Sequence, residues 1–115
     1  MSAPLVSVCI PCHNASPYVR QAIESILCQS WENLEVIVVD DGSTDGSIDV
    51  LKPLASPKVH LIYQENQGQC VAANKAYELA QGELIKFFDA DDLLALESIE
   101  HQVRRLDGCD HAVAS

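Results

Sequence analysis

Two aspartates at the end of an apolar segment have the residue type and the spacing of a divalent-metal site. Asp89 and Asp91 follow the segment 83–88, which has the composition of a buried strand. Residues two apart on a strand point to the same face, so the two carboxylates would lie side by side. They would repel each other unless a cation lay between them, and hard oxygen ligands suit Mg²⁺ or Mn²⁺. The alternative for so short a motif is a solvated acidic turn that caps the next helix.

The elements that would position these aspartates alternate along the whole chain. Strands are predicted where β-branched and apolar residues run together, and helices where apolar residues recur every three or four positions. The alternation of strands and helices along the chain predicts an α/β domain with a mostly parallel sheet, helices on both faces and right-handed crossovers. The predicted strands are 5–10, 34–39, 59–63 and 83–88, with a fifth beginning near 111, and the predicted helices are 17–28, 48–54, 69–80 and 96–106.

Three residues have the types expected at helix boundaries. Ser16 is a candidate N-cap, with Pro17 at the first helical position. Gly82 is expected to end the Ala-rich third helix, because glycine is common just past helix C-termini. That third helix is predicted to carry, on one side, Ala73, Ala76, Tyr77 and Ala80.

Polar clusters follow three of the predicted strands, at points far apart in the sequence. These clusters are His13 with Asn14, Asp40 with Asp41, and Asp89 with Asp91. Ligands of open α/β sheets bind outside the carboxyl ends of the strands, so we expect the three clusters to share one edge. Asp40 has an alternative role, because an aspartate in this position can cap the turn at Gly42 instead of contacting a ligand.

An edge rich in carboxylates suits a nucleotide when a metal ion neutralises its phosphates. Asp41 is the candidate for accepting hydrogen bonds from a nucleobase, while Asp89 and Asp91 would face the ribose and a metal ion on a diphosphate. The Lewis acidity of that metal would help a phosphate to leave. The sequence has no P-loop motif and no G-x-G-x-x-G after the first strand, which disfavours P-loop enzymes and dinucleotide dehydrogenases. It also lacks the acid pair that a phospho-receiver domain would place after that strand.

The composition limits the kind of protein and of partner. The chain has 115 residues, enough for one domain or part of one, and 48% of them are hydrophobic. A formal net charge of -10, from 17 acidic and 7 basic residues, disfavours nucleic acid as a partner. No apolar run is long enough for a membrane helix, and the first residues lack signal-peptide features, so a cytoplasmic location is expected.

Five cysteines, an odd number, are scattered along the chain and predict reduced thiols, not a disulfide framework. Cys9 and Cys12 spell C-x-x-C, which leaves a redox pair open, and His13 beside them leaves a zinc site open. Against both alternatives, Cys9 lies inside an apolar strand and is expected to point into the core. No second pair of zinc ligands follows.

Four segments, in this order, resemble motifs of the family 2 glycosyltransferases. Segment 6–14, VSVCIPCHN, is similar to that family's opening V-S-V-I-I-P-x-Y-N, and segment 38–45, VVDDGSTD, to its V-D-D-G-S-T-D. Segments 66–74 and 82–92 are similar to N-x-G-x-x-x-A-R-N and to G-E-Y-I-x-F-L-D-x-D-D, which ends in the D-x-D motif. Each motif is weak alone, but together they cover nearly the whole chain.

The resemblance implies a Rossmann-like GT-A fold and an inverting transfer of sugar from a nucleotide-diphosphate donor, commonly UDP-linked, to a carbohydrate or lipid-linked acceptor. It implies that Pro11 and His13 line the nucleoside pocket, Asp41 binds uracil, Asp89 lies against the ribose and Asp91 holds Mn²⁺ or Mg²⁺. The full set of candidate nucleotide-binding residues is Pro11, His13, Asn14, Asp40, Asp41, Gly68, Asp89 and Asp91, with Asp89 and Asp91 as the metal ligands.

Three features depart from the family pattern. His13 stands where a tyrosine is usual, and Ala73 replaces an arginine near the diphosphate. The family's general base is a carboxylate well beyond the D-x-D motif, so it is expected past Ser115. Residues 1–115 are therefore expected to be the nucleotide-diphospho-sugar-binding portion, without the acceptor part.

An incomplete sheet would leave an edge strand exposed and favour self-association. A membrane-peripheral position of a longer form stays open. A protein of a different class also stays open, namely a metal-dependent nucleotide-binding module without transfer activity.

Overall fold

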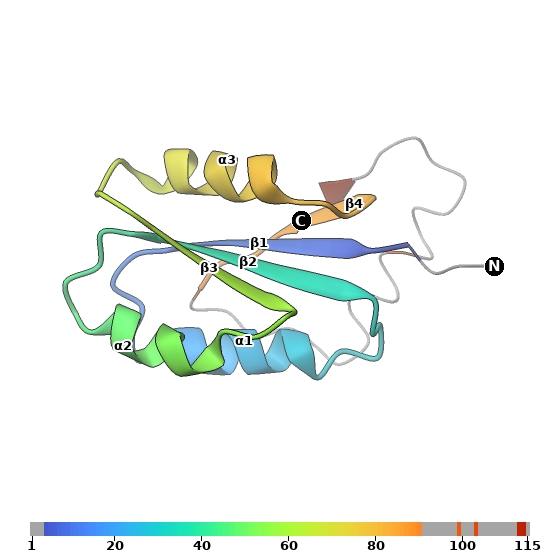
Figure 1. Cartoon of the computed structure of the whole chain (residues 1–115), viewed down its shortest axis with the longest axis horizontal. Helices are drawn as coiled ribbons and strands as arrows, with labels where there is room; N and C mark the ends of the chain where they lie inside the picture. The colour runs from blue at the N-terminus through green and yellow to red at the C-terminus, as the bar shows by residue number, and fades with distance from the viewer. Residues whose placement is uncertain (1–3, 91–98, 100–102, 104–112, 115) are drawn as a thin grey trace.

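Five parallel strands form one sheet in the order β3-β2-β1-β4-β5 (Figure 1). The computed structural model describes residues 4–90, 99, 103, 113 and 114. Every neighbouring pair of strands is parallel, which confirms the predicted α/β class. The strands are β1 (Val6–Cys12), β2 (Leu34–Asp41), β3 (Val59–Gln64), β4 (Leu84–Phe87) and β5 (Val113–Ala114), the last of which is the predicted fifth strand.

The helices that the structure describes with bounds are α1 (Val19–Leu27), α2 (Ser47–Leu51), α3 (Gln69–Leu79) and the 3-10 helix η1 (Lys52–Leu54). Figure 1 shows α1 and α2 on one face of the sheet and α3 on the other. Because side chains alternate between faces along a strand, β1 supplies both layers. Val8 and Ile10 pack with α1, whereas Cys9 packs with α3. Burial on both faces explains why the central strands are apolar almost throughout.

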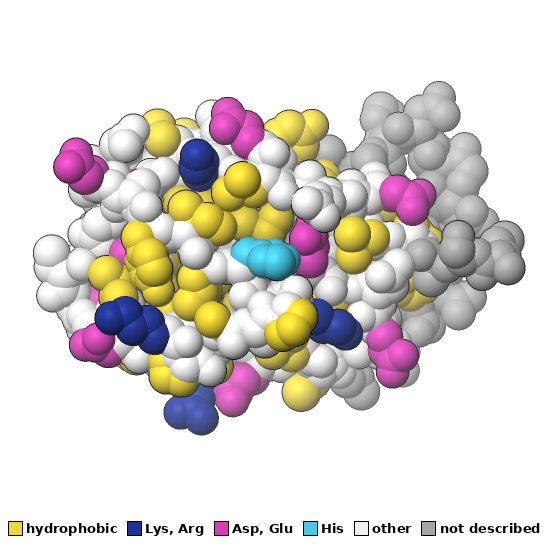
Figure 2. All heavy atoms as spheres, viewed as in Figure 1, with side chains coloured by type: hydrophobic (Ala, Val, Ile, Leu, Met, Phe, Trp, Pro, Cys, Tyr) yellow, Lys and Arg dark blue, Asp and Glu magenta, His cyan; other side chains and the backbone are white. Residues whose placement is uncertain are grey.

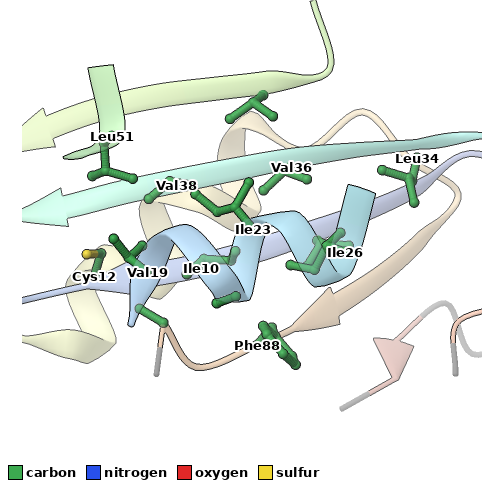
Figure 3. Packing of buried hydrophobic residues seen from close by; sticks show 14 of the residues in the cluster. Ile10, Cys12, Val19, Ile23, Ile26, Leu34, Val36, Val38, Leu51 and Phe88 are labelled. Carbon is green, nitrogen blue, oxygen red and sulfur yellow. The ribbon is translucent and has the colours of Figure 1, made fainter. Parts of the chain in front are cut away.

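The larger core lies between α1 and the sheet (Figure 3). Val19, Ile23 and Ile26 recur every three or four positions along α1 and are fully buried. They pack in the same cluster as Ile10 and Val38 of the two central strands. Removing one such side chain from water contributes about 2 kcal/mol, so this layer fixes α1 on the sheet.

The helix α1 begins at Val19, two residues later than predicted, and Ser16 does not cap it. Its N-cap residue is Tyr18, and no side chain there accepts a helix N–H. Ser16 instead donates its backbone N–H to the Asp45 carboxylate at 3.0 Å. The prediction of Ser16 as N-cap and Pro17 as first helical residue was wrong, because a contact with a distant loop takes the place of local capping.

The helix α3 packs on the sheet through Ala72 and Ala76, which are fully buried, whereas Tyr77 is 53% exposed. The predicted grouping of Ala73 and Tyr77 with Ala76 therefore does not describe the buried side. Alanine side chains differ little from one another, so the contrast between the two faces of this helix was too small to fix its orientation from periodicity.

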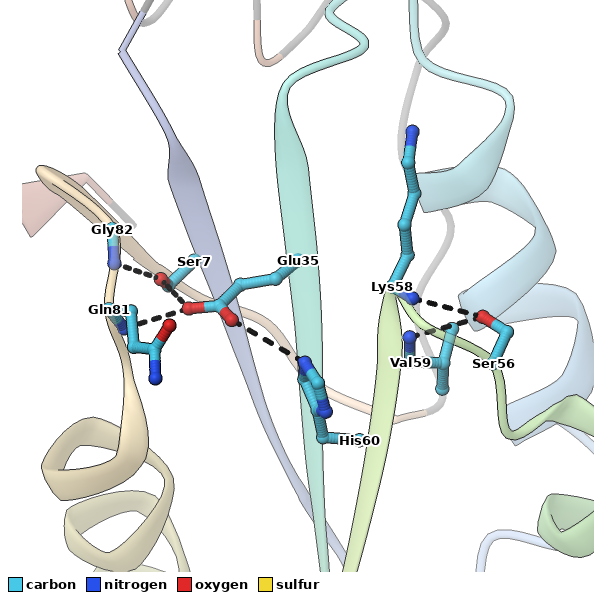
Figure 4. Close-up of polar contacts among 8 residues, drawn as sticks. All are labelled: Ser7, Glu35, Ser56, Lys58, Val59, His60, Gln81 and Gly82. Carbon is cyan, nitrogen blue, oxygen red and sulfur yellow. Dashed lines mark hydrogen bonds and ion pairs between the residues drawn. The ribbon is translucent and has the colours of Figure 1, made fainter.

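Gly82 does not end α3, which has the extended Ala80 as its C-cap. A Cβ added at Gly82 would lie 2.5 Å from Ser7 Oγ and 2.7 Å from the Leu5 carbonyl oxygen. The N–H of Gly82 donates to Ser7 Oγ at 2.8 Å, and that hydroxyl donates to the buried Glu35 carboxylate at 2.6 Å (Figure 4). Glycine is needed here because the chain passes so close to β1.

Most of the fourth predicted helix lies outside the described residues, as do Asp91 and Asp92. Within the range 96–106 the structure describes Ile99 and Val103, and both are helical. Ile99 is buried in the larger core and donates its N–H to the Gln29 side chain at 3.1 Å. Its burial agrees with the apolar stripe predicted there.

Candidate functional site

A cavity of about 350 Å³ opens where β1, β2 and β4 end. Its walls come from the segments that follow these strands and from the first residue of α3. The structure brings five of the eight predicted site residues together here, namely Pro11, His13, Asn14, Asp41 and Asp89. The remaining lining residues are Cys12, Ala15, Tyr18, Gln69 and Ala90.

Asp41 is a buried carboxylate at the end of β2, 2% exposed. One of its oxygens, Oδ1, accepts hydrogen bonds at 2.8 Å from the Gln64 side chain and from the Gln67 N–H. The other, Oδ2, accepts the Gly68 N–H at 3.0 Å and the Asn66 amide at 3.3 Å. Burial alone would raise the pKa of Asp41, but the hydrogen bonds outweigh it and lower the pKa. Asp41 is therefore ionised at neutral pH.

Gly68, a predicted nucleotide-binding residue, contacts Asp41 and is not among the cavity-lining residues. Its φ of 108° lies in the left-handed region, which glycine adopts without a steric penalty. Two successive N–H groups, of Gln67 and Gly68, point at this one carboxylate. The role of this loop is to hold Asp41 in place.

Asp40 is 1% exposed and points away from the cavity, to the opposite face of the sheet from Asp41. Its carboxylate accepts the Ser43 N–H at 3.0 Å and the Ser43 hydroxyl at 2.6 Å. This is the alternative role considered for Asp40, capping of the turn after β2. The structure therefore places the Asp40 carboxylate behind the site, buried and hydrogen-bonded to Ser43.

The His13 ring contacts Asp41, Asn66 and Asn14, and the shortest of these contacts indicates its tautomer. Its Nδ1 lies 2.8 Å from the Asp41 carbonyl oxygen, which can only accept, so Nδ1 carries the proton and donates. In the neutral ring Nε2 is then a hydrogen-bond acceptor, and the Asn14 amide lies 3.4 Å from it. His13 thus joins the ends of β1 and β2 while it lines the cavity.

Asp89 is exposed and lines the cavity just after β4. Because Asp41 already accepts four hydrogen bonds, Asp89 is the carboxylate with lone pairs left for a ligand among the described lining residues. Mg²⁺ binds through one or two carboxylates, waters and substrate phosphates, so this donor fits the predicted metal. The second predicted ligand, Asp91, lies outside the described residues, and within that description no three potential ligands cluster.

The C-x-x-C motif does not form a redox pair. Cys9 packs with α3 and Cys12 with α1, so the two thiols lie on opposite faces of the sheet. Burial raises the pKa of Cys9 to about 11, and burial with nearby Asp40 raises the pKa of Cys12 to about 12. Neither thiol forms a nucleophilic thiolate at neutral pH, and two inward-facing thiols cannot share one zinc ion.

Sequence reasoning missed two groups of residues at this site. Tyr18 and Gln69 line the cavity from the starts of α1 and α3, a position that their places beside the motifs could have indicated. The second group is the serine and aspartate side chains of the loop after β2, which contact the loop after β1. Those side chains are Ser43, Asp45 and Ser47.

The sheet and its strand-end cavity define an open α/β protein with a ligand site at the carboxyl edge. The sequence model of the family described as Glycosyl transferase family 2 matches residues 7–115, and the chain belongs to this family. An uncharacterised glycosyltransferase of Haemophilus influenzae is 42% identical over 106 residues, which are 90% of this chain and 42% of that protein. TuaG of Bacillus subtilis, a glycosyltransferase provisionally assigned to teichuronic acid biosynthesis, is 43% identical over 103 residues.

Solved structures of two glycosyltransferases superpose on the chain and confirm the expected GT-A fold. The mannosyltransferase PcManGT of Pyrobaculum calidifontis, in complex with GDP-Man and Mn²⁺, has a TM-score of 0.84 and 32% identity. TarS of S. aureus, in complex with UDP, has a TM-score of 0.80 and 27% identity. The match with PcManGT covers 91% of this chain and 33% of the PcManGT chain. The match with TarS covers 90% of this chain and 32% of the TarS chain. It spans 42% and 41% of the two curated relatives, less than half of either.

None of the helices in the described part of the chain is long and apolar enough to cross a membrane.

Proposed function

We propose that this chain is the donor-binding portion of an inverting glycosyltransferase, and that it binds a nucleotide-diphosphate sugar, UDP-linked, together with a divalent cation. The observation that carries the proposal is the convergence of Pro11, His13, Asn14, Asp41 and Asp89 on one strand-end cavity. No lysine or arginine occurs among the described residues that line it. A diphosphate there needs positive charge, and Mn²⁺ or Mg²⁺ bound at Asp89 would provide it.

Four of the lining residues have a stated role in this proposal. Pro11 and His13 form the wall for the nucleoside. Asp41, held ionised by its loop, would accept a hydrogen bond from the base in place of its longest one, from the Asn66 amide at 3.3 Å. Asp89 holds the cation, with Asp91 as the second ligand expected from the sequence. When bound, the cation supplies Lewis acidity that stabilises the departing nucleoside diphosphate. The chain's own residues bind and orient the donor, while the general base belongs to the expected acceptor part.

Relatives support the donor class and the pathway class. One related structure contains UDP, another of the same protein contains UDP-GlcNAc, and a third glycosyltransferase contains GDP-Man and Mn²⁺. The provisional assignment of TuaG to teichuronic acid synthesis supports a polysaccharide or glycoconjugate product. A carbohydrate or lipid-linked acceptor is proposed on the same ground.

Calorimetric titration with UDP, with and without MnCl₂, tests the proposal. We expect measurable binding with Mn²⁺ and a large loss without it. Asp89→Ala should weaken binding in the presence of Mn²⁺ by about tenfold, because one carboxylate ligand is lost while the phosphate ligands remain.

The matched control is Asp49→Ala, an exposed aspartate on α2 that is not among the cavity-lining residues. It should bind UDP as the wild type does. Equal binding by the wild type and Asp89→Ala, or binding that ignores Mn²⁺, would contradict the proposed metal site.

A binding module without transfer activity is the second candidate, because the roles proposed for Asp41 and Asp89 leave no other described carboxylate in the cavity wall to act as a general base. A donor-hydrolysis assay separates the two. A module binds UDP-GlcNAc and leaves it intact, whereas slow release of the free sugar would show catalytic competence.

We further propose that the edge strand β3 mediates self-association. β3 pairs with β2 and has no other partner among the described strands. Beside it lies a groove of about 530 Å³ with Ile37, Ile62 and Leu79 in its walls, and Figure 2 shows hydrophobic side chains gathered on this face. The backbone N–H and C=O groups on this free edge are the groups with which the β3 strand of a second copy would pair.

Sedimentation velocity over a range of concentrations checks this pairing. We expect the wild type to associate reversibly, and Tyr63→Lys, at an exposed position of β3, to weaken association, because a lysine on an edge strand disfavours pairing with a second strand. A wild type that stays monomeric throughout, as the net charge of -10 on each copy would favour, would exclude the proposal.

A further inference from the structure

The turn that follows β1 carries His13 and Asn14 into the cavity in an uncommon backbone conformation. Asn14 has φ 50°, the one non-glycine residue with positive φ in the described part of the chain. Asparagine tolerates this region better than most residues, but the conformation still has to be held in place. The shape of the cavity wall therefore depends on what holds residues 13–16.

Three successive backbone N–H groups of this turn donate to side chains of one other loop, the segment 43–47 after β2. The bonds are Asn14 N–H to Ser43 Oγ at 2.9 Å, Ala15 N–H to Ser47 Oγ at 3.1 Å and Ser16 N–H to Asp45 Oδ2 at 3.0 Å. A fourth bond runs the other way, from the Thr44 N–H to Asn14 Oδ1 at 2.8 Å. All three amides of the turn are thus satisfied by the chain itself.

Carboxylates set the direction of the two serine hydroxyls. Ser43 Oγ donates its proton to Asp40 at 2.6 Å, and Ser47 Oγ donates its proton to Asp45 at 2.6 Å. A hydroxyl has one proton, so each serine oxygen can present only lone pairs to the turn after β1. The carboxylates thereby make both serines obligatory acceptors.

Asp45 connects the two loops in a way that local capping does not explain. Its Oδ1 accepts the Ser47 N–H at 3.0 Å and the Ser47 hydroxyl, which is an Asx turn just before α2. Its Oδ2 reaches across to Ser16, 29 residues earlier in the chain. The hydrogen bonds from Ser47, with those from Ser16, lower the pKa of Asp45 to about 2, so the carboxylate stays ionised at neutral pH.

We propose that Asp45 is a positioning residue for nucleotide binding, acting through Ser16 and Ser47 to hold His13 and Asn14 in the wall of the cavity. This rests on the proposed function, since it assigns a role within that same site. Asp45 is not among the residues that line the cavity. It accepts the Ser16 amide directly and orients Ser47 to accept the Ala15 amide, so the turn shapes the nucleoside end of the site, while the phosphates are left to the cation.

Asp45→Asn is the sharpest test. An amide can accept a hydrogen bond at one of the two positions that Asp45 occupies, but not at both, because its NH₂ group only donates. The matched control is Asp49→Asn, which removes the same charge from an exposed residue four positions on, outside the network. Both variants are compared with the wild-type chain by calorimetry with UDP and MnCl₂, by NMR titration with uridine, and by amide hydrogen exchange without ligand.

We expect Asp45→Asn to weaken binding of UDP and of uridine by the same factor, about tenfold, which corresponds to one lost hydrogen bond to a charged group. The Ser16 amide should exchange faster, while the amides of Val8 and Val38 in the sheet keep their protection. Asp49→Asn should match the wild type in all three measurements. A merely structural role would change stability and leave the affinity of the folded chain unaltered.

The outcomes separate this inference from the proposed function. Wild-type affinity in Asp45→Asn, or an unprotected Ser16 amide in the wild type, would overturn the positioning role and leave the function standing. A loss restricted to UDP, with uridine binding unchanged, would overturn it as well, because it would place the effect at the phosphates. Failure of the wild type to bind UDP would overturn the proposed function itself.

Discussion

Replacing Asp41 with asparagine is expected to lower the free energy of unfolding by about 3 kcal/mol at pH 7, because a buried charged acceptor is lost. Asp41 accepts four hydrogen bonds, two of them from backbone N–H groups that cannot move away. The asparagine NH₂ group would face donors at one of its two positions and leave at least two of them unsatisfied. Urea denaturation followed by circular dichroism measures the loss.

The effect of Asp41→Asn should depend on pH in a direction that the pKa fixes. The pKa of Asp41 is lowered in the folded chain from its ordinary 3.8. Its stabilising contribution is therefore fully present above about pH 4 and is lost as the pH falls through the folded pKa. The free energies of unfolding of the wild type and Asp41→Asn should accordingly converge as the pH is lowered below about 4.

A control for charge alone is Asp49→Asn, which should change the free energy of unfolding by less than about 0.5 kcal/mol. The same variants titrated with UDP add a functional measurement, since Asp41 is proposed to face the base. Equal stability of Asp41→Asn and the wild type at pH 7 would show that the loop 64–68 does not depend on this carboxylate.

Replacing Gly82 with alanine is expected to cost about 3 kcal/mol, at the upper end of overpacking effects. The added methyl group would approach Ser7 Oγ to 2.5 Å, the Leu5 carbonyl oxygen to 2.7 Å and the Ser7 nitrogen to 2.8 Å. Two of these are backbone atoms of or beside β1, so no side-chain rotation relieves the contact. The hydrogen bonds that join residue 82, Ser7 and Glu35 would be broken or lengthened (Figure 4).

Gln81→Ala is the matched control for Gly82→Ala. The Gln81 side chain is exposed, and its hydrogen bond to Glu35, at 2.8 Å, is made by the backbone N–H that alanine keeps. Chemical denaturation of both variants should show a loss for Gly82→Ala alone. A Gly82→Ala chain as stable as the wild type would mean that residue 82 can move from β1 without cost.

The sheet and the place of the site could be predicted because they depend on strong, local patterns. Nearly continuous apolar segments such as 34–39 indicate strands that are buried on both faces. The structure agrees, because β2 is buried over all eight residues. Parallel connectivity then brings all strand ends to one edge, so the meeting of His13, Asp41 and Asp89 at one cavity followed from chain order alone.

What could not be predicted depends on contacts between distant residues. Asp40 and Asp41 are chemically identical neighbours, and only the continuation of β2 to its last residue sends one to each face of the sheet. Gly82 is a residue type that often ends helices, but glycine is required at this position because the chain passes close to β1. Ser16 has the type of an N-cap, but the Asp45 carboxylate from another loop supplies the stronger contact.

The strand order also bears on how the chain is made. β1 is flanked by β2, its next strand in sequence, and by β4, which follows two further crossovers. During synthesis on the ribosome, β1, α1 and β2 can associate as soon as they emerge, whereas one flank of β1 has to wait for residues 84–87. In that interval the backbone N–H and C=O groups on one side of β1 are unpaired. The nascent chain is then most prone to aggregate through this edge, and a chaperone that covers it would have its largest effect.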